Sequence, residues 1–418
     1  MIGSSVGYRE YNKFTMNITL QDIKEARELI KGIALYTPIK KTGHFSAMVG
    51  NNIYLKMENM QHTGAFKYRG ARVKLLSLTE DEKKRGVITA SAGNHAQGVA
   101  SNAQQLGIKA TIVMPEGTPL VKVTATKGYG AEVILFGDSF HEAFGHAMEL
   151  KEKRDLVFIH PFEDPKIIAG QGTIGLELLE QAPELDLVVV PVGGGGVISG
   201  IAIALKSLKP SIQVIGVQAS NSPSVYRSFR SGKAEMVEAK ATIAEGIAVK
   251  QASPVMLEIL KKYVDDIVLV EEAEIASAIL LLMERSKVVV EGAGASSLAA
   301  VLYNKIPVKN KNIGVVLTGG NIDVNMLSRI IESGLAKSGR LVRMSVFVID
   351  KPGALQRLTT IIAGHKANIL QVIHNRLSSE MPLGETEINL TLETRGQDHI
   401  ESIISDLNAQ GYKVTKQK

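Results

Sequence analysis

The sequence contains no cysteine among its 418 residues. This absence excludes disulfide bonds, thiolate metal sites and a cysteine nucleophile, and it fits a reducing compartment, so we expect a cytoplasmic protein. No apolar run reaches the roughly 18 residues that a membrane-spanning helix needs. Residues 1–19 carry charges and lack the apolar core of a signal peptide. We therefore expect no membrane partner.

The sequence also lacks a concentrated basic segment. Its formal net charge is +6, but Asp and Glu are mixed among Lys and Arg along the whole chain. Such a diluted charge does not form the patch that nucleic-acid binding requires, so we expect no nucleic-acid partner. A mildly basic surface attracts small anionic molecules instead.

The residues that are present suffice for several domains. With 45% hydrophobic residues, a chain of this length buries a sizeable core and is predicted to form two or three domains. Residues 1–17 are interpreted as a loose N-terminal extension. From residue 87 on, short runs rich in Val and Ile alternate with longer helical patterns, which predicts an α/β architecture with buried parallel sheets. Strands are expected over residues 87–91, 110–114, 132–136, 156–160, 187–192, 214–217 and 313–317, and helices over residues 96–106, 139–154, 167–181 and 197–208.

The composition changes near residues 338–340, where a glycine and two charged residues precede a new strand pattern. The order that follows is strand, helix, strand, strand, helix, strand, a small α+β sandwich of the ferredoxin-like type over residues 341–418. Its elements are expected over residues 341–349, 354–363, 369–376, 385–392, 399–409 and 412–415.

A lysine stands where a helix begins. Lys67 follows Gly64, Ala65 and Phe66. The helix N-terminus and desolvation beside Phe66 both disfavour an ammonium, so both lower the pKa of Lys67 toward that of a nucleophilic amine. Such an amine can form a Schiff base. On these residues alone, a surface lysine or one that pairs with a phosphate is favoured, because a lysine is rarely catalytic without other evidence.

A polar segment, residues 91–98, lies directly after an apolar strand and directly before a helix. This is the carboxyl end of a parallel strand, where open α/β sheets bind ligands. Ser91, the backbone around Gly93 and the start of the helix offer several donors aimed at one point, which suits a carboxylate. A serine cap, an asparagine turn and a hydrogen-bonded His95 explain the same residues without a ligand.

Four consecutive glycines, Gly193, Gly194, Gly195 and Gly196, lie between a strand and the helix that starts at Val197. Glycines let the backbone turn sharply and direct successive amides at an anion, and the helix dipole adds to the attraction. Phosphate is the expected ligand, and a plain tight turn is the alternative. The run matches neither a P-loop nor a dinucleotide fingerprint, so it gives only weak support to a nicotinamide dehydrogenase.

A hydroxyl, that of Thr318, stands at the end of another predicted strand, in the sequence Thr-Gly-Gly-Asn over residues 318–321. A threonine in this place is most often a turn or cap residue.

Taken together and in this order, the four segments resemble the fold type II pyridoxal-phosphate enzymes and, among them, the threonine and serine dehydratases. The resemblance covers residues 22–337. It implies two open parallel-sheet subdomains of the tryptophan-synthase-beta-like type within residues 18–337, the smaller over residues 67–160. It also implies the cofactor pyridoxal 5'-phosphate and the elimination of water from L-threonine, and from L-serine, giving 2-oxobutanoate or pyruvate and ammonia.

The resemblance assigns a role to each segment. Lys67, with Phe66 beside it, would form the Schiff base and remove the α proton of the substrate. Residues 193–196 and the Val197 amide would hold the cofactor phosphate. Asn94 would bond the pyridine hydroxyl, and Thr318 would face the pyridine nitrogen, where a hydroxyl in place of a carboxylate favours elimination over transamination.

The substrate carboxylate would be received by Ser91, Asn94 and His95. Serine racemases, which are similar, carry a serine where this chain has Ala92, and alanine cannot exchange a proton, so a dehydratase is favoured over a racemase. Residues 218–224 contain no carboxylate where those racemases bind a divalent cation, so we predict no metal there. A racemase, another β-elimination or replacement enzyme, and a noncatalytic amino-acid sensor remain alternatives.

Residues 341–418 resemble an ACT domain, an amino-acid-sensing module, through the order of their elements and the Pro-Gly turn at Gly353 after the first strand. The resemblance implies an allosteric site near Gly353 and Asn368 for an amino-acid effector such as isoleucine or valine. A purely structural oligomerisation module is the alternative. Since such relatives commonly form dimers or tetramers, we expect a homodimer or homotetramer.

Overall fold

The computed structural model describes residues 16–376 and 384–417. Its contacts divide the chain after Ile322 into two compact units, residues 1–322 and 323–418, and each is described by itself. The N-terminal extension expected over residues 1–17 lies outside the described residues except for its last two.

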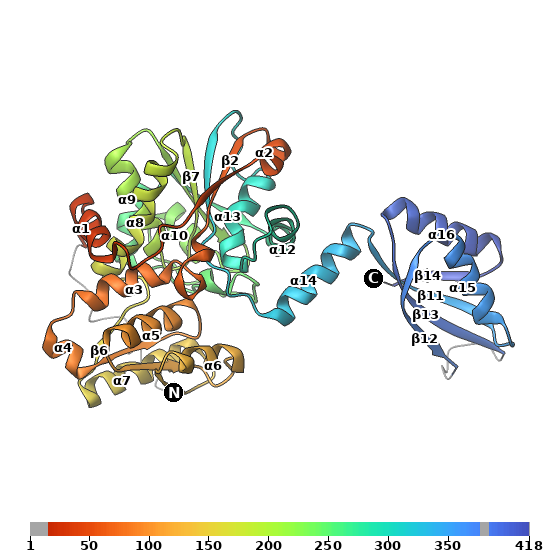
Figure 1. The fold of residues 1–418 in the computed structure, drawn as a ribbon, viewed down its shortest axis with the longest axis horizontal. Coiled ribbons are helices and arrows are strands. Elements are labelled where there is room, and N and C mark those ends of the chain that lie inside the picture. Colours follow the sequence, from red (N-terminus) through yellow and green to blue (C-terminus); the bar gives the residue numbers. More distant parts are fainter. Residues whose placement is uncertain (1–15, 377–383, 418) are drawn as a thin grey trace. The chain divides into compact units, whose positions relative to one another are not determined.

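The larger sheet of the first unit has the strand order β1-β2-β10-β7-β8-β9 and is parallel except for the pair β1 and β2 (Figure 1). Helices cover both of its faces, and its central strands are largely apolar, as in other doubly covered parallel sheets. One face packs against α8, α9 and α11, and the other against α13. The strands are β1 (Ile39–Thr42), β2 (Asn52–Lys56), β7 (Leu187–Pro191), β8 (Gln213–Ala219), β9 (Asp266–Val270) and β10 (Asn312–Val316), and the helices are α1 (Leu20–Ile30), α2 (Gly43–Val49), α8 (Pro165–Gln181), α9 (Gly196–Leu208), α10 (Ser224–Ser231), α11 (Pro254–Tyr263), α12 (Glu272–Leu281) and α13 (Gly292–Leu302).

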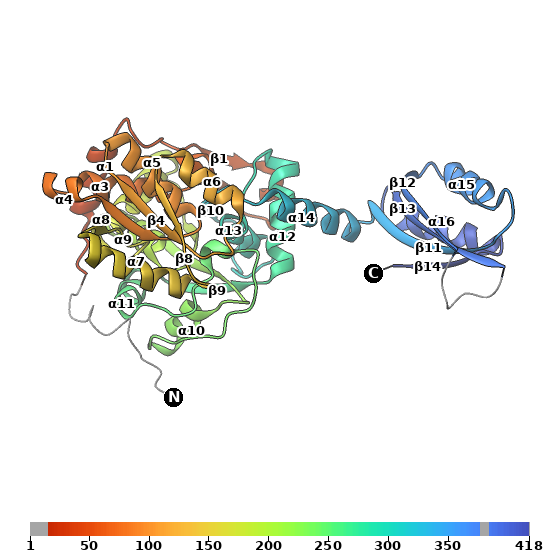
Figure 2. The ribbon, with the colours of Figure 1, turned by 90° about the horizontal axis from the view of Figure 1, so that it is seen from below.

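A smaller sheet of the same unit has the order β5-β4-β3-β6 and is wholly parallel. Alternate residues of its central strands face opposite ways: Ile112 packs with α5, whereas Ile88 and Val113 pack with α7. Figure 2 shows α5 and α7 on opposite sides of this sheet. Its strands are β3 (Val87–Ala90), β4 (Ala110–Met114), β5 (Glu132–Leu135) and β6 (Val157–Phe158), and its helices are α3 (Lys67–Leu76), α4 (Glu80–Arg85), α5 (Asn94–Leu106), α6 (Leu120–Gly128) and α7 (Phe140–Arg154).

The second unit has an antiparallel sheet of order β12-β13-β11-β14, packed on two helices around a core of its own. Helix α14 (Val324–Lys337) also belongs to this unit, although we predicted that the first region extends to residue 337. The reason is that α14 contacts β11, and Glu332 on it pairs with Arg343 at 3.1 Å. The remaining elements are β11 (Leu341–Ile349), α15 (Ala354–Gly364), β12 (Asn368–Asn375), β13 (Glu385–Glu393), α16 (Gln397–Ala409) and β14 (Lys413–Lys416).

The predicted fold class is confirmed: two parallel sheets in the first region and a βαββαβ unit after it. Every strand and helix that the sequence predicted exists, with β4 and β11 at the predicted bounds. The prediction missed the strands β1, β2 and β9, of which β1 and β2 complete one side of the large sheet. It also missed the helices α1, α2, α4, α6 and α10 to α14. Strand β6 is shorter than expected, because only residues 157–158 pair with β3.

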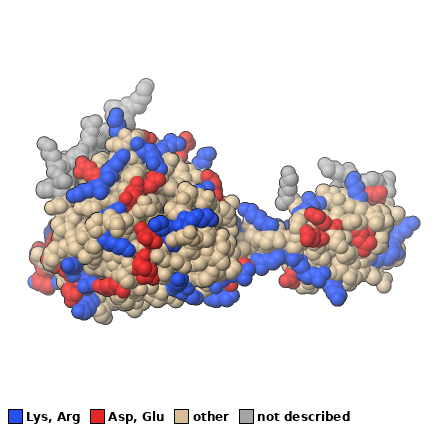
Figure 3. All heavy atoms as spheres, turned by 90° about the horizontal axis from the view of Figure 1, so that it is seen from above, with Lys and Arg blue, Asp and Glu red and all other residues tan. Residues whose placement is uncertain are grey.

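Among the described residues, no helix is long and apolar enough to cross a membrane. On the face drawn in Figure 3, basic and acidic side chains are interspersed over the first unit. That face therefore shows the mixed charge that the sequence predicted.

Candidate functional site

The lysine segment is joined to the loop that follows β10. Ala65 forms an isolated antiparallel bridge with Gly319, and the Phe66 N–H donates to the Thr318 carbonyl at 3.1 Å. These two contacts place Lys67, the first residue of α3, beside the Thr-Gly-Gly-Asn segment. Thr318 itself is buried. Two of the segments that the sequence singled out therefore meet in the structure.

The Lys67 side chain is partly buried and points inward. Its Nζ donates to the Pro161 carbonyl at 2.6 Å and lies 5.2 Å from the centroid of the Phe66 ring. Burial lowers the pKa of Lys67 to about 8, while the charge of Glu291 acts in the opposite direction. A lysine with this pKa offers a neutral amine at mildly alkaline pH, as nucleophilic and base chemistry require.

The tetraglycine loop, residues 193–196, packs against Phe162, the residue that follows Pro161. A Cβ atom on Gly194 would lie 2.4 Å from the Phe162 ring, and Gly195 has a φ of +94° at the N-cap of α9. Glycine is therefore required at one position for space and at the other for conformation. In the part of the chain that the structure describes, the backbone N–H groups of residues 193–197 have no hydrogen-bond acceptor. Free amides at the head of a helix form a site for an anion such as phosphate.

The third segment lies at the start of α5, after β3. Asn94 donates from Nδ2 to Glu291 Oε1 at 2.7 Å and accepts at Oδ1 from Asn321 Nδ2 at 2.8 Å. Ser91 is partly buried in the same turn, and its Oγ accepts from the Gly93 N–H at 3.2 Å. The backbone N–H groups of Asn94 and His95 have no acceptor among the described residues, so the head of α5 presents free donors.

His95 is predicted to receive the substrate carboxylate, and the state of its ring leaves this role to its backbone. Its Nε2 lies 3.1 Å from the Ile159 carbonyl, which can only accept, so Nε2 carries the proton and Nδ1 is left as an acceptor. Burial and the charge of Lys67 lower the pKa of His95 to about 3, which keeps the ring neutral. Nδ1 is buried without a partner among the described residues. A ring in this state cannot donate to a carboxylate, so only the backbone N–H of His95 can do so.

Several residues of the site carry no signal, or only a weak one, in the sequence. Pro161 and Phe162 connect Lys67 with the tetraglycine loop, and no local pattern marks them. Burial and the charge of Lys67 lower the pKa of His160 to about 4, and its Nδ1 accepts from the Glu163 N–H at 2.7 Å. Glu291 carried one signal: it is an acidic residue between an apolar run and four small residues, where a charge is not expected.

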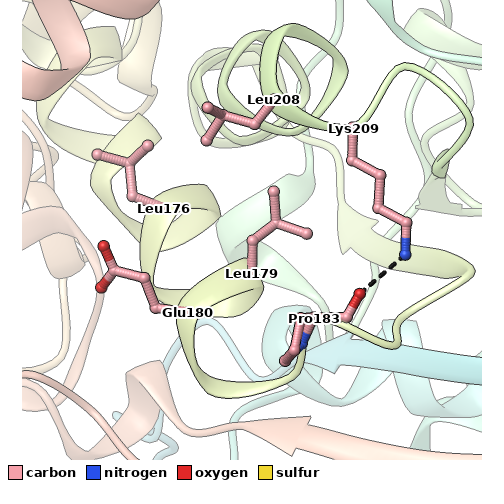
Figure 4. Close-up of a pocket in the computed structure, with 6 residues that line it drawn as sticks. All are labelled: Leu176, Leu179, Glu180, Pro183, Leu208 and Lys209. Carbon is pink, nitrogen blue, oxygen red and sulfur yellow. Dashed lines mark hydrogen bonds between the residues drawn. The ribbon is translucent and has the colours of Figure 1, made fainter.

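A separate surface pocket of about 350 Å³ lies between the ends of α8 and α9 (Figure 4). Leu176, Leu179 and Leu208 line it, and at its rim Lys209 Nζ donates to the Pro183 carbonyl at 2.9 Å. None of the residues lining this pocket is one of the predicted site residues. The pocket therefore does not belong to the candidate site.

The two residues of the predicted effector site are separated within one copy of the chain. Gly353 caps the start of α15, after β11 ends at Ile349, whereas Asn368 opens β12. Asn368 of β12 and Leu341 of β11 both pair with Glu393 of β13, so these two residues lie at the same end of the sheet. Ile349, the last residue of β11, lies at the opposite end. Helix α15, of 11 residues, spans about 16 Å between them. One small effector therefore does not contact both residues in a single chain.

Comparison with known proteins gives consistent matches. The model of the pyridoxal-phosphate dependent enzyme family matches residues 30–319, and that of the ACT domain matches residues 337–410. The chain is 55% identical, over 95% of its own length and 99% of the relative's, to an L-threonine ammonia-lyase of Thermotoga maritima. Among solved structures it resembles threonine deaminase isoform 2 of Solanum lycopersicum, with a TM-score of 0.72, 36% identity and coverage of 76% of this chain and 91% of that one. Maize serine racemase has the same TM-score at 34% identity, with 77% of this chain and 98% of that one covered.

Proposed function

Since this chain belongs to the family of pyridoxal-phosphate dependent enzymes and carries an ACT domain, we propose that it eliminates water from L-threonine, giving 2-oxobutanoate and ammonia. L-Serine, which would give pyruvate, is the second substrate. The similarity to an L-threonine ammonia-lyase over nearly the whole chain supports the reaction. The observation that carries the proposal is the common position of two groups. Lys67 Nζ bonds to the Pro161 carbonyl, and the tetraglycine loop, whose backbone N–H groups have no acceptor among the described residues, packs against Phe162, the next residue.

The residues present fit the cofactor, pyridoxal 5'-phosphate. Lys67 offers an amine of lowered pKa for its aldehyde carbon, and the tetraglycine loop with the Val197 amide offers unpaired N–H groups for its phosphate. Asn94 keeps one uncommitted N–H for the ring oxygen, and Thr318 would face the ring nitrogen. When bound, the cofactor supplies an electron sink for negative charge at the substrate's α carbon.

The chain's own groups would then bind the substrate and move its proton. Ser91 Oγ and the free backbone N–H groups of Asn94 and His95, at the positive end of the α5 dipole, would hold the substrate carboxylate. Lys67 Nζ would take the proton from the α carbon. Its pKa of about 8 leaves about a tenth of the amine neutral at pH 7, against less than a thousandth for an ordinary lysine. Elimination of the hydroxyl follows loss of this proton.

The ACT domain supports control by an amino acid such as isoleucine or valine. Since Gly353 and Asn368 lie at opposite ends of the sheet, we propose that an effector site uses Gly353 of one copy and Asn368 of a second. This requires a homodimer or homotetramer. The absence of cysteine fits a cytoplasmic location.

The test is a keto-acid assay of the purified protein on L-threonine and L-serine, with and without isoleucine and valine. We expect 2-oxobutanoate from threonine and the visible absorbance of bound cofactor, both abolished by Lys67→Ala. Chiral analysis of recovered serine in deuterated solvent separates elimination from racemisation. Full activity in Lys67→Ala, or D-serine as the main product, would refute the proposal.

A further inference from the structure

Glu291 is a partly buried carboxyl group of the site that the proposed function does not use. It is the N-cap residue of α13, but its side chain makes no capping hydrogen bond. Its backbone is fixed on both sides, since its N–H donates to the Gly319 carbonyl at 3.0 Å and its carbonyl accepts from the Ala295 N–H at 2.9 Å. The carboxylate is therefore free to turn from the helix toward Asn94.

Glu291 is the last acceptor in a chain of hydrogen bonds in which each donor and acceptor can be assigned in only one way. Asn321 Nδ2 donates to the Thr63 carbonyl at 2.7 Å and to Asn94 Oδ1 at 2.8 Å, which uses both of its hydrogens. Because the Thr63 carbonyl can only accept, the Asn321 amide cannot be reversed. Asn94 must therefore present Oδ1 to Asn321 and Nδ2 to Glu291 Oε1, at 2.7 Å. One hydrogen of Asn94 Nδ2 remains uncommitted among the described residues.

The surrounding backbone leaves room for this contact. A Cβ atom on Gly319 would lie 2.5 Å from Glu291 Oε1 and 3.0 Å from Asn94 Nδ2. A Cβ atom on Gly246 would lie 3.7 Å from the same carboxylate oxygen. The first glycine of the Thr-Gly-Gly-Asn segment is therefore required for the pairing of Glu291 with Asn94.

Charges from three other elements act on the carboxylate. Burial raises the pKa of Glu291 to about 7; the Asn94 hydrogen bond and the charges of Lys122 and Lys67 lower it, and Glu245 raises it. Lys122 on α6 and Glu245 in the turn Glu245–Ile247 form an ion pair of 2.7 Å with each other. A carboxyl group in this setting is an acceptor for Asn94 whether or not it carries a proton on its other oxygen.

We propose that Glu291 is the positioning residue of Asn94: it holds the amide so that the second N–H of Asn94 donates to the ring oxygen of the cofactor. This inference rests on the proposed function, which places that oxygen beside Asn94. The required property of Glu291 is an acceptor atom, and its negative charge is not required.

The test compares Glu291→Gln, which keeps an acceptor oxygen, with Glu291→Ala, which removes it. The readouts are the Kd for pyridoxal 5'-phosphate and the absorbance maximum of the bound cofactor. We expect Glu291→Ala to weaken binding up to about tenfold, the loss of about one hydrogen bond, and to shift the absorbance. Glu291→Gln should stay within about threefold of the wild type. Glu271→Gln, at the N-cap of α12 outside the site, is the matched control.

A double-mutant cycle shows whether Glu291 acts through Asn94. In an Asn94→Ala background, adding Glu291→Ala should change Kd by less than about twofold. Additive losses in the cycle, equal losses in Glu291→Gln and Glu291→Ala, or wild-type Kd and absorbance in Glu291→Ala would each overturn the inference. A wild-type protein that binds no cofactor, in contrast, would overturn the proposed function itself.

Discussion

Lys67 Nζ donates a hydrogen bond of 2.6 Å to the carbonyl oxygen of Pro161. Phe162, the next residue, occupies the space in which side chains on Gly194 and Gly196 would lie. The position of the amine and the shape of the tetraglycine loop thus depend on the same two residues. A substitution in the tetraglycine loop should therefore also change the position of the Lys67 amine.

The first prediction concerns Gly194. In Gly194→Ala the new Cβ would lie 2.4 Å from the Phe162 ring, so the ring or the loop must move. We expect the Kd for pyridoxal 5'-phosphate to rise at least about tenfold, since the loop amides no longer converge on the phosphate. Gly145→Ala, in the middle of α7 with nothing within 4 Å of the added Cβ, is the control and should not change Kd. Unchanged binding in Gly194→Ala would mean that this loop does not hold the phosphate.

The second prediction concerns the protonation of Lys67 in the apoprotein. Because its pKa is lowered to about 8, the neutral fraction should rise tenfold between pH 6 and about 7 and level off above pH 9. The unfolded chain, with an ordinary lysine, binds more protons between these pKa values, so this group makes folding more favourable as pH rises from about 8 to 10. Competitive labelling with acetic anhydride, read by mass spectrometry, measures the neutral fraction. Exposed Lys24 in the same digest is the reference. Labelling of Lys67 that still rises steeply above pH 10 would contradict the burial that the structure shows.

Site residues that interact across a long stretch of sequence leave no local pattern, whereas the four predicted segments each have one. The segments around Lys67, Ser91, Gly193 and Thr318 were found because each has a local pattern: a lysine after small and aromatic residues at a helix start, a polar segment or a glycine run between a strand and a helix, and a hydroxyl at a strand end. The pairing of Asn94 with Glu291 spans 197 positions and has no local pattern. The sequence also does not indicate which atom of His95 could receive a carboxylate, because the ring tautomer is set by the distant Ile159 carbonyl.

The same reason explains what was missed in the fold. Strand β2 pairs with β10 across about 260 positions, Ile53 with Ile313, and its short apolar run lies outside any βαβ spacing. In the second unit, the bounds of β11 were predicted as the structure has them. The reason is that helices and strands alternate locally there, and the core residues follow the periods of a helix and a strand.

The third prediction tests the shared effector site. Gly353→Ala introduces a side chain at a φ of +82°, and Asn368→Ala removes an amide. Each variant alone should lose the response to the effector while keeping basal keto-acid formation. If one site uses Gly353 of one copy and Asn368 of another, a mixture of the variants in equal amounts should regain about a quarter of the sites, because half of the dimers are mixed and each has one intact site. Titration calorimetry counts the sites. A mixture that binds no effector would exclude sharing between copies.

The fourth prediction concerns the buried charges beneath α3. Arg69, two residues after Lys67, pairs through Nε with Glu58 at 2.8 Å and through Nη1 with Glu177 at 2.6 Å, and Lys56 pairs with Glu177 at 2.5 Å. All four side chains are buried, so Arg69→Met leaves one carboxylate without a cation. We expect a loss of about 3–5 kcal/mol in the free energy of unfolding of the first unit. Arg85→Met, which breaks an exposed pair with Asp155, should cost less than about 1 kcal/mol.

A second variant separates the effect of charge from that of packing. In Arg69→Met with Glu58→Gln, the remaining ions are Lys56 and Glu177, which already contact each other, so the cluster is neutral again. This double variant should recover at least about 1–2 kcal/mol relative to Arg69→Met, as measured by equilibrium denaturation in urea. If the double variant is no more stable than Arg69→Met, the loss arises from the packing of α3 against α8 and not from the unpaired carboxylate, and the electrostatic account of this cluster is wrong.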